Sequence, residues 1–419
     1  MELKSNEEKI TRALLVSVDT GEYDAQASLE ELFELVKSAG AEPVFSVTQN
    51  LNKVETATYV GTGKLAEITE ICNAQEIDLI VVDSELSPTQ IKNMEAETDV
   101  RVIDRTTLIL DIFAQRARSK EGKLQVELAQ LKYMLPRLTG KGIAMSRLGG
   151  GIGTRGPGET KLETDRRHIR RRMETLKEEL TDLEKHRNML RKRREKDGVI
   201  TVAIVGYTNA GKSTLMNYLT DAGVLAQDKL FATLDPTSRA LKLPSGVTVM
   251  LIDTVGLVRR LPHHLVEAFR STLEEAAQSD IILNVCDASS EEARTHMQVT
   301  TDLLESLGCG DRPIITVLNK CDLVKDEVLA QDFCSYIRIS AKNGTGVEKL
   351  LQAIDDNLPV RMKRVKLLIP FANAGLANEI RTKGTLICEE YVSEGLEIEA
   401  VVDEMLYSKL KQFEILNNQ

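Results

Sequence analysis

The sequence has no long hydrophobic run and few cysteines. No apolar stretch reaches the roughly 18 residues that a membrane-spanning helix needs, and the opening MELKSNEEKI lacks the apolar core of a signal peptide. We therefore expect a cytoplasmic protein without a membrane span, with peripheral association with a membrane left open. The cysteines form no C-x-x-C pair, so reduced thiols are expected rather than a disulfide framework or a zinc site. They are Cys72, Cys286, Cys309, Cys321, Cys334 and Cys388.

The balance of residue types predicts a soluble protein of several domains. At 419 residues the chain is too long for one hydrophobic core and suggests about three domains. Apolar residues make up 42% of the chain and charged residues 28%, which is typical of globular proteins. The formal net charge of −10 argues against a protein that coats nucleic acid uniformly, although a local basic patch is compatible with it.

A phosphate-binding loop is predicted within residues 201–215, TVAIVGYTNAGKSTL. An apolar run meets Gly206, and Gly211, Lys212 and Ser213 complete the pattern G-x-x-x-x-G-K-[ST]. Glycines let backbone N–H groups surround a β-phosphate, the lysine offers charge to the β- and γ-phosphates, and the serine hydroxyl suits Mg²⁺. A chance glycine-rich turn is disfavoured, because strand, loop and helix follow in the required order. The predicted contacts are Gly206, Tyr207, Thr208, Asn209, Ala210, Gly211, Lys212 and Ser213.

Two later segments predict the γ-phosphate and magnesium contacts. The polar segment 227–239 offers Thr233 and Thr237, either of which can close the Mg²⁺ shell when a γ-phosphate is bound. The apolar strand 247–252 ends at Asp253, whose carboxylate suits a Mg²⁺-bound water, and Gly256 offers a backbone N–H to the γ-phosphate. The predicted contacts are Phe231, Ala232, Thr233, Leu234, Asp235, Asp253, Thr254, Val255 and Gly256.

A carboxylate after a further strand identifies the base as guanine. The strand 314–318 leads into the sequence N-K-C-D, which ends at Asp322. Its carboxylate can accept two hydrogen bonds from N1–H and the exocyclic amine of guanine, whereas adenine has no such donor pair. The segment I-S-A-K at 339–342 offers a backbone contact to the guanine O6. The predicted base contacts are Asn319, Lys320, Cys321, Asp322, Ser340, Ala341 and Lys342.

The catalytic group is not identified by the sequence. Leu257 follows Gly256 where Ras-like enzymes carry the glutamine that orients the attacking water. Intrinsic hydrolysis is therefore expected to be slow, with the water positioned by backbone groups, by potassium or by a partner. Four basic residues lie just beyond, and solvated residues of a switch segment are favoured over a catalytic role for them: Arg259, Arg260, His263 and His264.

The first part of the chain predicts a small α/β domain and a helical hairpin. Residues 1–105 alternate β-branched runs with helical patterns, which favours a mostly parallel sheet. Within it, YVGTGK at 59–64 is interpreted as a turn before a helix, with a second nucleotide or RNA-phosphate contact as the alternative. Helical periodicity from Thr106 to about Arg137 and from about Lys161 to Lys196 predicts two long antiparallel helices.

The hairpin carries a basic, glycine-rich loop between its helices. Residues 139–160 contain eight glycines and one proline, which exclude regular structure. Five arginines follow between positions 166 and 172, so the local charge is opposite to that of the whole chain. This pattern favours an RNA-contacting surface, because arginines bind phosphates bidentately. A solvated helix face is an equal alternative, since acidic residues interleave with the basic ones at ion-pair spacing.

Five stretches carry a resemblance to a known family, and the first three of them lie before the phosphate-binding loop. They are YVGTGK (59–64), DRTTLIL (104–110), GGGIGTRGPGETKLETDRR (149–167), GYTNAGKST (206–214) and FATLDPT (231–237). Together they resemble the HflX family of bacterial ribosome-associated GTPases. The resemblance implies binding to the large ribosomal subunit and its rRNA, GTP-dependent splitting of ribosomes after stress, and Mg²⁺ ligands at Ser213 and Thr233 rather than Thr237.

The predicted fold class is α/β and multidomain. It comprises an N-terminal α/β domain at 1–110, a helical hairpin with the basic loop at 111–197, and a Ras-like P-loop G domain at 198–360. A small α+β domain with a βαββα pattern follows at 361–419, and it offers no chemistry of its own. We expect a monomer.

Two functional hypotheses from different classes remain open. The favoured one is a GTP-binding and GTP-hydrolysing factor that binds the large ribosomal subunit and splits or rescues ribosomes, with Mg²⁺ and optionally K⁺ as cofactors. The alternative is an RNA-remodelling or RNA-chaperone protein whose G domain senses nucleotide. A metabolic enzyme with a regulatory G domain is disfavoured, because residues 1–105 show no catalytic triad, metal cluster or carboxylate pair.

Overall fold

The computed structural model describes residues 10–138, 161–196, 199–220, 237–260, 276–310, 312–324, 335–359, 363–402 and 404–415. The chain divides into two compact units. The first comprises Met1–Leu183, Lys229–Leu234 and Arg259–Phe269, and the second comprises the remaining residues. No helix in the described part of the chain is long and apolar enough to cross a membrane.

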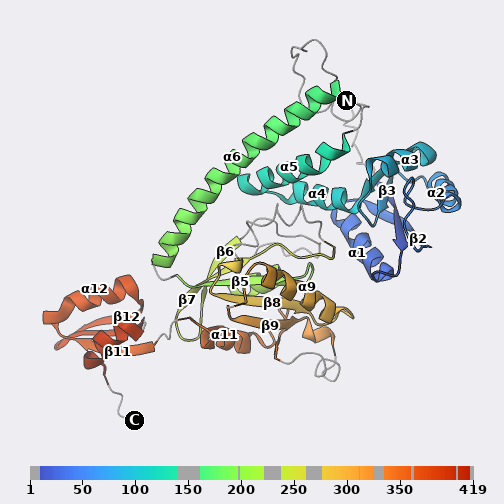
Figure 1. Cartoon of the computed structure of the whole chain (residues 1–419). Helices are drawn as coiled ribbons and strands as arrows, with labels where there is room; N and C mark the ends of the chain where they lie inside the picture. The colour runs from blue at the N-terminus through green and yellow to red at the C-terminus, as the bar shows by residue number, and fades with distance from the viewer. Residues whose placement is uncertain are drawn as a thin grey trace, which may run out of the picture. The chain divides into compact units, whose positions relative to one another are not determined.

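A parallel four-stranded sheet forms the N-terminal domain, drawn in blue in Figure 1. Its strands lie in the order β2-β1-β3-β4, so the direction of winding reverses between β1 and β3. Apolar residues of β1 and β3 pack in one core with residues of α2 and α3. The strands are β1 (Arg12–Asp19), β2 (Glu42–Asn50), β3 (Leu79–Val82) and β4 (Arg101–Asp104), and the helices are α1 (Ala25–Ser38), α2 (Thr62–Ala74) and α3 (Pro88–Thr98). The predicted α/β domain with a parallel sheet is confirmed.

The segment predicted as one helix from Thr106 to about Arg137 is interrupted. It forms α4 (Arg105–Arg116) and α5 (Lys120–Met134), followed by the short turn η1 (Leu135–Arg137). The chain leaves helical geometry at Ala117, where ψ is 112°. Ser119 then starts a new helix, since its Oγ accepts a hydrogen bond from Gly122 N at 2.8 Å. The prediction of a single helix was wrong, because α4 ends before Ala117 and the N-cap residue Ser119 starts α5 within the same apolar pattern.

The second helix of the hairpin, α6, spans Lys161–Lys196 as predicted. Three contacts fix its direction relative to α5: Lys120 with Glu179 at 3.6 Å, Glu127 with Arg172 at 2.7 Å, and Leu138 O with Arg166 at 3.0 Å. The partner positions on α6 fall from 179 to 166 as the positions in and just after α5 rise from 120 to 138, so the two helices run antiparallel. The glycine-rich loop 139–160 lies outside the described residues.

A six-stranded sheet in the order β10-β9-β8-β5-β7-β6 forms the core of the second unit. All pairings are parallel except that of β6 with β7, so the carboxyl ends of five strands meet at one edge. Ligands of open α/β sheets bind at this edge. The strands are β5 (Thr201–Gly206), β6 (Thr237–Lys242), β7 (Thr248–Asp253), β8 (Ile281–Asp287), β9 (Ile314–Asn319) and β10 (Ile337–Arg338). The helical segments are α7 (Lys212–Thr220), α9 (Ala293–Ser306), η2 (Cys321–Leu323) and α11 (Val347–Asp356).

The C-terminal part is a three-stranded antiparallel sheet with helices on one face. Its order is β11-β13-β12, and apolar residues of α12 and α13 pack in the same core as β11 and β13. The elements are β11 (Lys363–Ile369), η3 (Phe371–Asn373), α12 (Ala374–Lys383), β12 (Thr385–Val392), β13 (Gly395–Val402), α13 (Glu404–Leu410) and η4 (Lys411–Phe413). The predicted βαββα pattern is confirmed.

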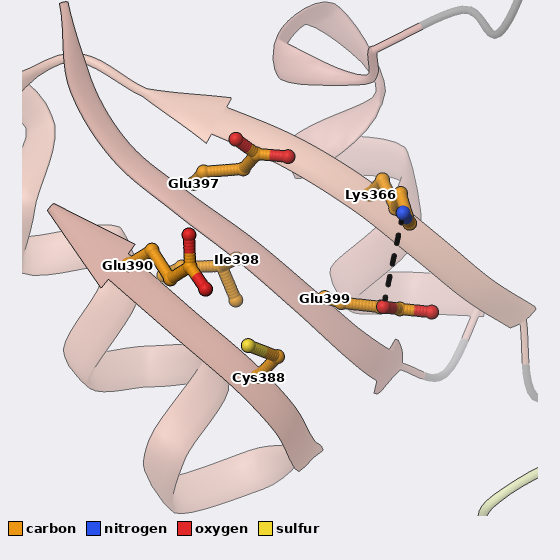
Figure 2. Close-up of a pocket in the computed structure, with 6 residues that line it drawn as sticks. All are labelled: Lys366, Cys388, Glu390, Glu397, Ile398 and Glu399. Carbon is orange, nitrogen blue, oxygen red and sulfur yellow. Dashed lines mark ion pairs between the residues drawn. The ribbon is translucent and has the colours of Figure 1, made fainter. Parts of the chain in front are cut away.

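A small polar pocket lies on this C-terminal sheet (Figure 2). Two of its glutamates, Glu390 and Glu397, stand opposite each other on β12 and β13, and Lys366 lies 4.0 Å from Glu399. No group of three or more His, Cys, Asp or Glu side chains suited to a metal ion occurs in the part of the chain that the structure describes. The full lining is Lys366, Cys388, Glu390, Glu397, Ile398 and Glu399. The pocket offers no nucleotide chemistry.

Candidate nucleotide site

The predicted phosphate loop connects β5 to α7, at the carboxyl edge of the six-stranded sheet. Gly206 has φ +154°, and a Cβ there would lie 2.1 Å from the carbonyl oxygen of Val285 on β8. Gly211 has φ +87°, and a Cβ there would lie 2.2 Å from Nδ2 of Asn319 on β9. Neither position can hold a side chain, because the loop packs directly against the ends of two neighbouring strands.

Lys212 is buried at the start of α7 and faces its own loop. Its Nζ donates a hydrogen bond to the carbonyl oxygen of Tyr207 at 2.7 Å. Burial lowers the pKa of Lys212 to about 8, and the nearby Asp253 carboxylate partly opposes this shift. A phosphate group beside Nζ would supply negative charge, raise the pKa and favour the ammonium form.

Ser213 and Asp253 meet beside the loop. The Ser213 hydroxyl donates to Oδ2 of Asp253 at 2.8 Å, and Asp253 is buried at the end of β7. A hydroxyl and a carboxylate are oxygen ligands of the kind that Mg²⁺ prefers. The second predicted metal ligand, Thr233, and the other predicted contacts in that segment, Phe231, Ala232, Leu234 and Asp235, lie outside the described residues.

The segment after Asp253 passes directly over the loop. A Cβ on Gly256 would lie 2.7 Å from Cγ2 of Thr208 and 3.1 Å from Nζ of Lys212. The next residue, Leu257, donates its N–H to Gly206 O at 3.2 Å and accepts from Thr208 N at 2.7 Å. Its side chain is only 3% exposed, so Leu257 is a packing residue. The Leu257 side chain therefore offers no polar group that could orient an attacking water.

Two other predicted contacts in this segment are also buried. The Thr254 hydroxyl donates to Ile204 O on β5 at 2.7 Å, and Val255 is 4% exposed. The Thr254 side chain therefore connects β7 to β5, and a nucleotide contact from either residue would have to come from its backbone.

Asn319 links the phosphate loop to the base-side loop. Its Nδ2 donates to Ala210 O at 2.8 Å, and its Oδ1 accepts from Ala341 N at 2.9 Å. The residue is 2% exposed, so water does not replace these bonds. Asn319 thus holds two loops that are far apart in the sequence at a fixed separation.

The predicted base-recognition residues follow β9 directly. Asp322 is exposed on η2, and a hydrogen bond from the side chain of Ser340 lowers the pKa of its carboxyl group. The group is therefore a carboxylate that can accept hydrogen bonds at neutral pH. Lys320, with φ +61°, pairs with Asp287 at 2.7 Å. Cys321 donates its thiol to Leu318 O, and Lys342 follows Ala341 in the base-side loop.

Sequence reasoning missed an aromatic contact of the phosphate loop. The ring of Tyr207 stacks on His296 of α9, with ring centroids 3.8 Å apart and an interplanar angle of 12°. Nε2 of His296 lies 3.8 Å from Glu292 on the same helix. Nearly ninety residues separate the two rings, and no spacing rule connects them. Only the packing of α9 beside β5 brings them together.

The stretch 59–64 of the N-terminal domain is a turn followed by the start of α2, as favoured. The hydroxyl of the buried Tyr59 accepts from Val18 N at 3.3 Å, and Gly61 N donates to Gln49 at 2.9 Å. Lys64 pairs with Glu67 of its own helix at 2.7 Å.

The fold and the arrangement of these motifs define a P-loop GTPase. Three family models match successive parts of the chain: "GTP-binding GTPase N-terminal" over 26–114, "GTP-binding GTPase Middle Region" over 116–194 and "50S ribosome-binding GTPase" over 201–320. The proteins called GTPase HflX from Lacrimispora saccharolytica and Caldanaerobacter subterraneus subsp. tengcongensis are both 50% identical to the chain. The alignment with the first relative covers 98% of this chain and 97% of that protein. The alignment with the second covers 96% of this chain and 93% of that protein. The chain belongs to the HflX family of GTPases: it binds GTP and hydrolyses it to GDP and phosphate.

Solved structures with similar folds include a GTP-binding protein from the archaeon Sulfolobus solfataricus in complex with GDP. It is 27% identical to this chain, with a TM-score of 0.45, and the match covers 83% of this chain and 98% of that one.

Proposed function

We propose that this GTPase binds the large ribosomal subunit and, in its GTP-bound form, splits or rescues ribosomes. The observation that carries the proposal is the match of residues 201–320 to the family described as 50S ribosome-binding GTPase. A nucleotide site alone would fit many binding partners. The antiparallel hairpin of α5 and α6 supplies a second, independent argument, because its chemistry suits RNA.

Helix α6 is basic in an acidic protein. Its sequence contains fourteen Lys and Arg residues against eight Asp and Glu residues, a net charge of +6, while the whole chain has −10. Arg172 is neutralised by Glu127, whereas Arg170 and Arg171 are exposed beside it. Exposed guanidinium groups of this kind bind phosphates of an RNA backbone, and such binding weakens with salt.

The chemistry of the site favours Mg²⁺ as the metal cofactor. Ser213 would hold the ion directly and Asp253 would hold one of its waters, since their oxygens already lie 2.8 Å apart. When bound, the ion neutralises charge on the β- and γ-phosphates. The buried Leu257 cannot orient water, so we expect slow hydrolysis that ribosomal subunits accelerate. A requirement for K⁺ would appear as a loss of activity when Na⁺ replaces it.

Three further expectations accompany the proposal. The domain boundaries near 110, 197 and 360 stay predictions, as do a monomeric state and a cytoplasmic location.

The test is sedimentation of ribosomes on a sucrose gradient with the full chain and a non-hydrolysable GTP analogue. We expect the protein to migrate with the large subunit and intact ribosomes to decrease. Protein that stays at the top of the gradient, with ribosomes intact, would refute the proposal. GTP hydrolysis should also rise by at least tenfold with purified large subunits, in line with the gains that partners give other P-loop GTPases.

Matched variants separate nucleotide sensing from RNA contact. Lys212→Ala should abolish binding to the subunit because it removes the charge that faces the phosphates. The pair Arg170→Glu and Arg171→Glu should weaken subunit binding and leave GDP affinity unchanged, while Lys349→Glu on α11, an exposed lysine of the second unit, should change neither. If Lys212→Ala preserved RNA binding and strand rearrangement, the chain would instead be an RNA-remodelling protein.

A further inference from the structure

The carboxyl edge of the N-terminal sheet holds a buried charge cluster. Asp83 directly follows β3, beside the point where the winding reverses between β1 and β3. Its side chain is fully buried, and its Oδ1 accepts from Nη1 of Arg105 at 2.7 Å. Arg105 also pairs with Glu31 of α1, and both side chains of this pair are at least nine-tenths buried. Parallel sheets bind their ligands at this kind of crevice.

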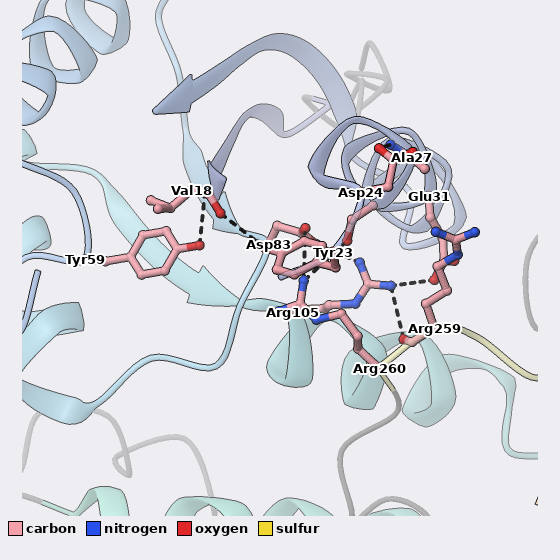
Figure 3. A network of polar contacts seen from close by, with 11 residues as sticks. Val18, Tyr23, Asp24, Ala27, Glu31, Tyr59, Asp83, Arg105, Arg259 and Arg260 are labelled. Atoms are coloured by element: carbon pink, nitrogen blue, oxygen red, sulfur yellow. Dashed lines mark hydrogen bonds and ion pairs between the residues drawn. The ribbon is translucent and has the colours of Figure 1, made fainter. Parts of the chain in front are cut away.

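Arg260 occupies this crevice (Figure 3). Its Nη1 lies 3.5 Å from Oδ2 of Asp83 and 3.4 Å from Oγ of Ser28, and its guanidinium carbon lies 4.1 Å from the ring centroid of Tyr23. The chain beside it is also held, since Nη2 of Arg105 donates to the carbonyl oxygen of Arg259 at 3.4 Å. Arg260 is exposed, in line with the solvated residue favoured from the sequence, although its side chain also has anionic, polar and aromatic neighbours.

The environment of Asp83 explains why an arginine is stable there. Asp83 and Glu31 are buried carboxylates, and Arg105 pairs with both of them. Arg259 belongs to the same network of polar side chains in Figure 3. Oδ1 of Asp83 accepts from Arg105, and its other oxygen, Oδ2, lies 3.5 Å from Nη1 of Arg260, so the Arg260 guanidinium stabilises this buried carboxylate. The face of the Tyr23 ring adds a cation–π contact.

The docked arginine lies four residues beyond Gly256 in the chain, and the intervening segment covers the phosphate loop. The backbone N–H of Thr208 donates a hydrogen bond to the carbonyl oxygen of Leu257, and Nζ of Lys212 donates to that of Tyr207. A γ-phosphate that contacts Gly256 N–H and Lys212 must exchange some of these bonds for its own oxygens. If Arg260 is held in the crevice, the short segment from Gly256 to Arg260 has little freedom to move. It therefore resists the exchange of these hydrogen bonds for bonds to the γ-phosphate.

We infer that the crevice formed by Asp83, Glu31, Arg105, Ser28 and Tyr23 is the receptor for Arg260, and that its occupancy opposes the binding of GTP relative to GDP. Coupling is reciprocal, so GTP must in turn loosen the docking of Arg260. This inference rests on GTP binding by the chain. It does not depend on the ribosome as partner, and it is tested without one.

The experiment measures the affinities of the full chain for GDP and for a non-hydrolysable GTP analogue. Arg260→Gln removes the docked charge, and the ratio of the analogue Kd to the GDP Kd should fall about fivefold to tenfold, within the usual range of allosteric coupling. Arg260→Lys keeps the charge, so its ratio of the two Kd values should lie between those of the wild type and of Arg260→Gln. Arg239→Gln on β6 changes an exposed arginine and serves as the matched control, with no change in the ratio.

A second measurement reports docking directly. Hydrogen exchange of the peptide that contains Asp83 should be faster with the GTP analogue than with GDP, and Arg260→Gln should remove this difference. Asp83→Asn, combined with Arg260→Gln, should add nothing further to the affinity ratio, because both changes break one interaction. A ratio that stays within twofold of the wild type in Arg260→Gln, or that rises, overturns the inference. Exchange that is independent of nucleotide in the wild type overturns it equally.

Discussion

Replacement of Asn319 by alanine tests the link between the two loops of the nucleotide site. The substitution removes two hydrogen bonds at 2.8 Å and 2.9 Å, and leaves Ala210 O and Ala341 N buried without that partner. Each unmet buried group costs about 1–3 kcal/mol, so the two together cost about 2–6 kcal/mol. If only the lower end of this range is expressed as loss of binding, GDP affinity falls roughly 30-fold.

The assay is the Kd of GDP, measured by titration calorimetry on the full chain. Asn93→Ala is the matched control: its side chain also donates to a backbone carbonyl, Ala57 O at 3.0 Å, but that bond is exposed in the N-terminal domain. The control should bind GDP like the wild type, because water replaces an exposed bond. An Asn319→Ala protein that binds GDP within threefold of the wild type would refute the view that this residue holds the loops in place.

Three other predictions concern the same site. GDP affinity should fall by up to tenfold per pH unit as the pH rises above about 8, because Lys212, with a pKa of about 8, must be charged to hold phosphate. The Lys212→Met protein should show no such pH dependence in titrations from pH 7 to 9.5. Gly206→Ala should abolish nucleotide binding, since its Cβ would lie 2.1 Å from Val285 O. Gly63 has open space around it, so the control Gly63→Ala should keep full GDP affinity and raise the free energy of unfolding by about 0.5–1 kcal/mol in thermal unfolding. Asp322→Ala should reduce the preference for GDP over ADP by at least about 100-fold in competition binding; an unchanged preference would exclude this carboxylate as the base reader.

Much of the fold was predictable because its signals are local. Each nucleotide motif lies in a short stretch at the end of a strand, and a parallel sheet requires these stretches to follow one another in a fixed order. The motifs are the glycines of the phosphate loop, Asp253 and the N-K-C-D segment. The strands of the N-terminal domain are short, β-branched and separated by helical patterns, which a sequence shows directly. In each case the residues that determine a strand, helix or loop lie within that segment or within a few residues of it.

The rest depended on contacts between distant residues. The break between α4 and α5 was missed because the leucine pattern continues past Ser119, and only its N-cap bond ends the helix. The stack of Tyr207 on His296 and the docking of Arg260 at Asp83 join segments about 90 and 180 residues apart. Leu257 was recognised as a departure from the Ras-like pattern, but its role as a packing residue required the backbone pairing with Gly206 and Thr208.

The bond between Ser213 and Asp253 bears on how the proposed Mg²⁺ ion would enter the site. Oδ2 of Asp253 already accepts from the Ser213 hydroxyl at 2.8 Å, so the ion would have to displace this bond before the hydroxyl could coordinate it. Phosphate oxygens supply the extra ligands that make the exchange favourable, because Mg²⁺ in such sites is bound by one or two protein oxygens together with phosphates. We therefore expect the proposed metal to enter together with the nucleotide. Changes in free magnesium should then leave the protein unaffected until a nucleotide arrives with the ion.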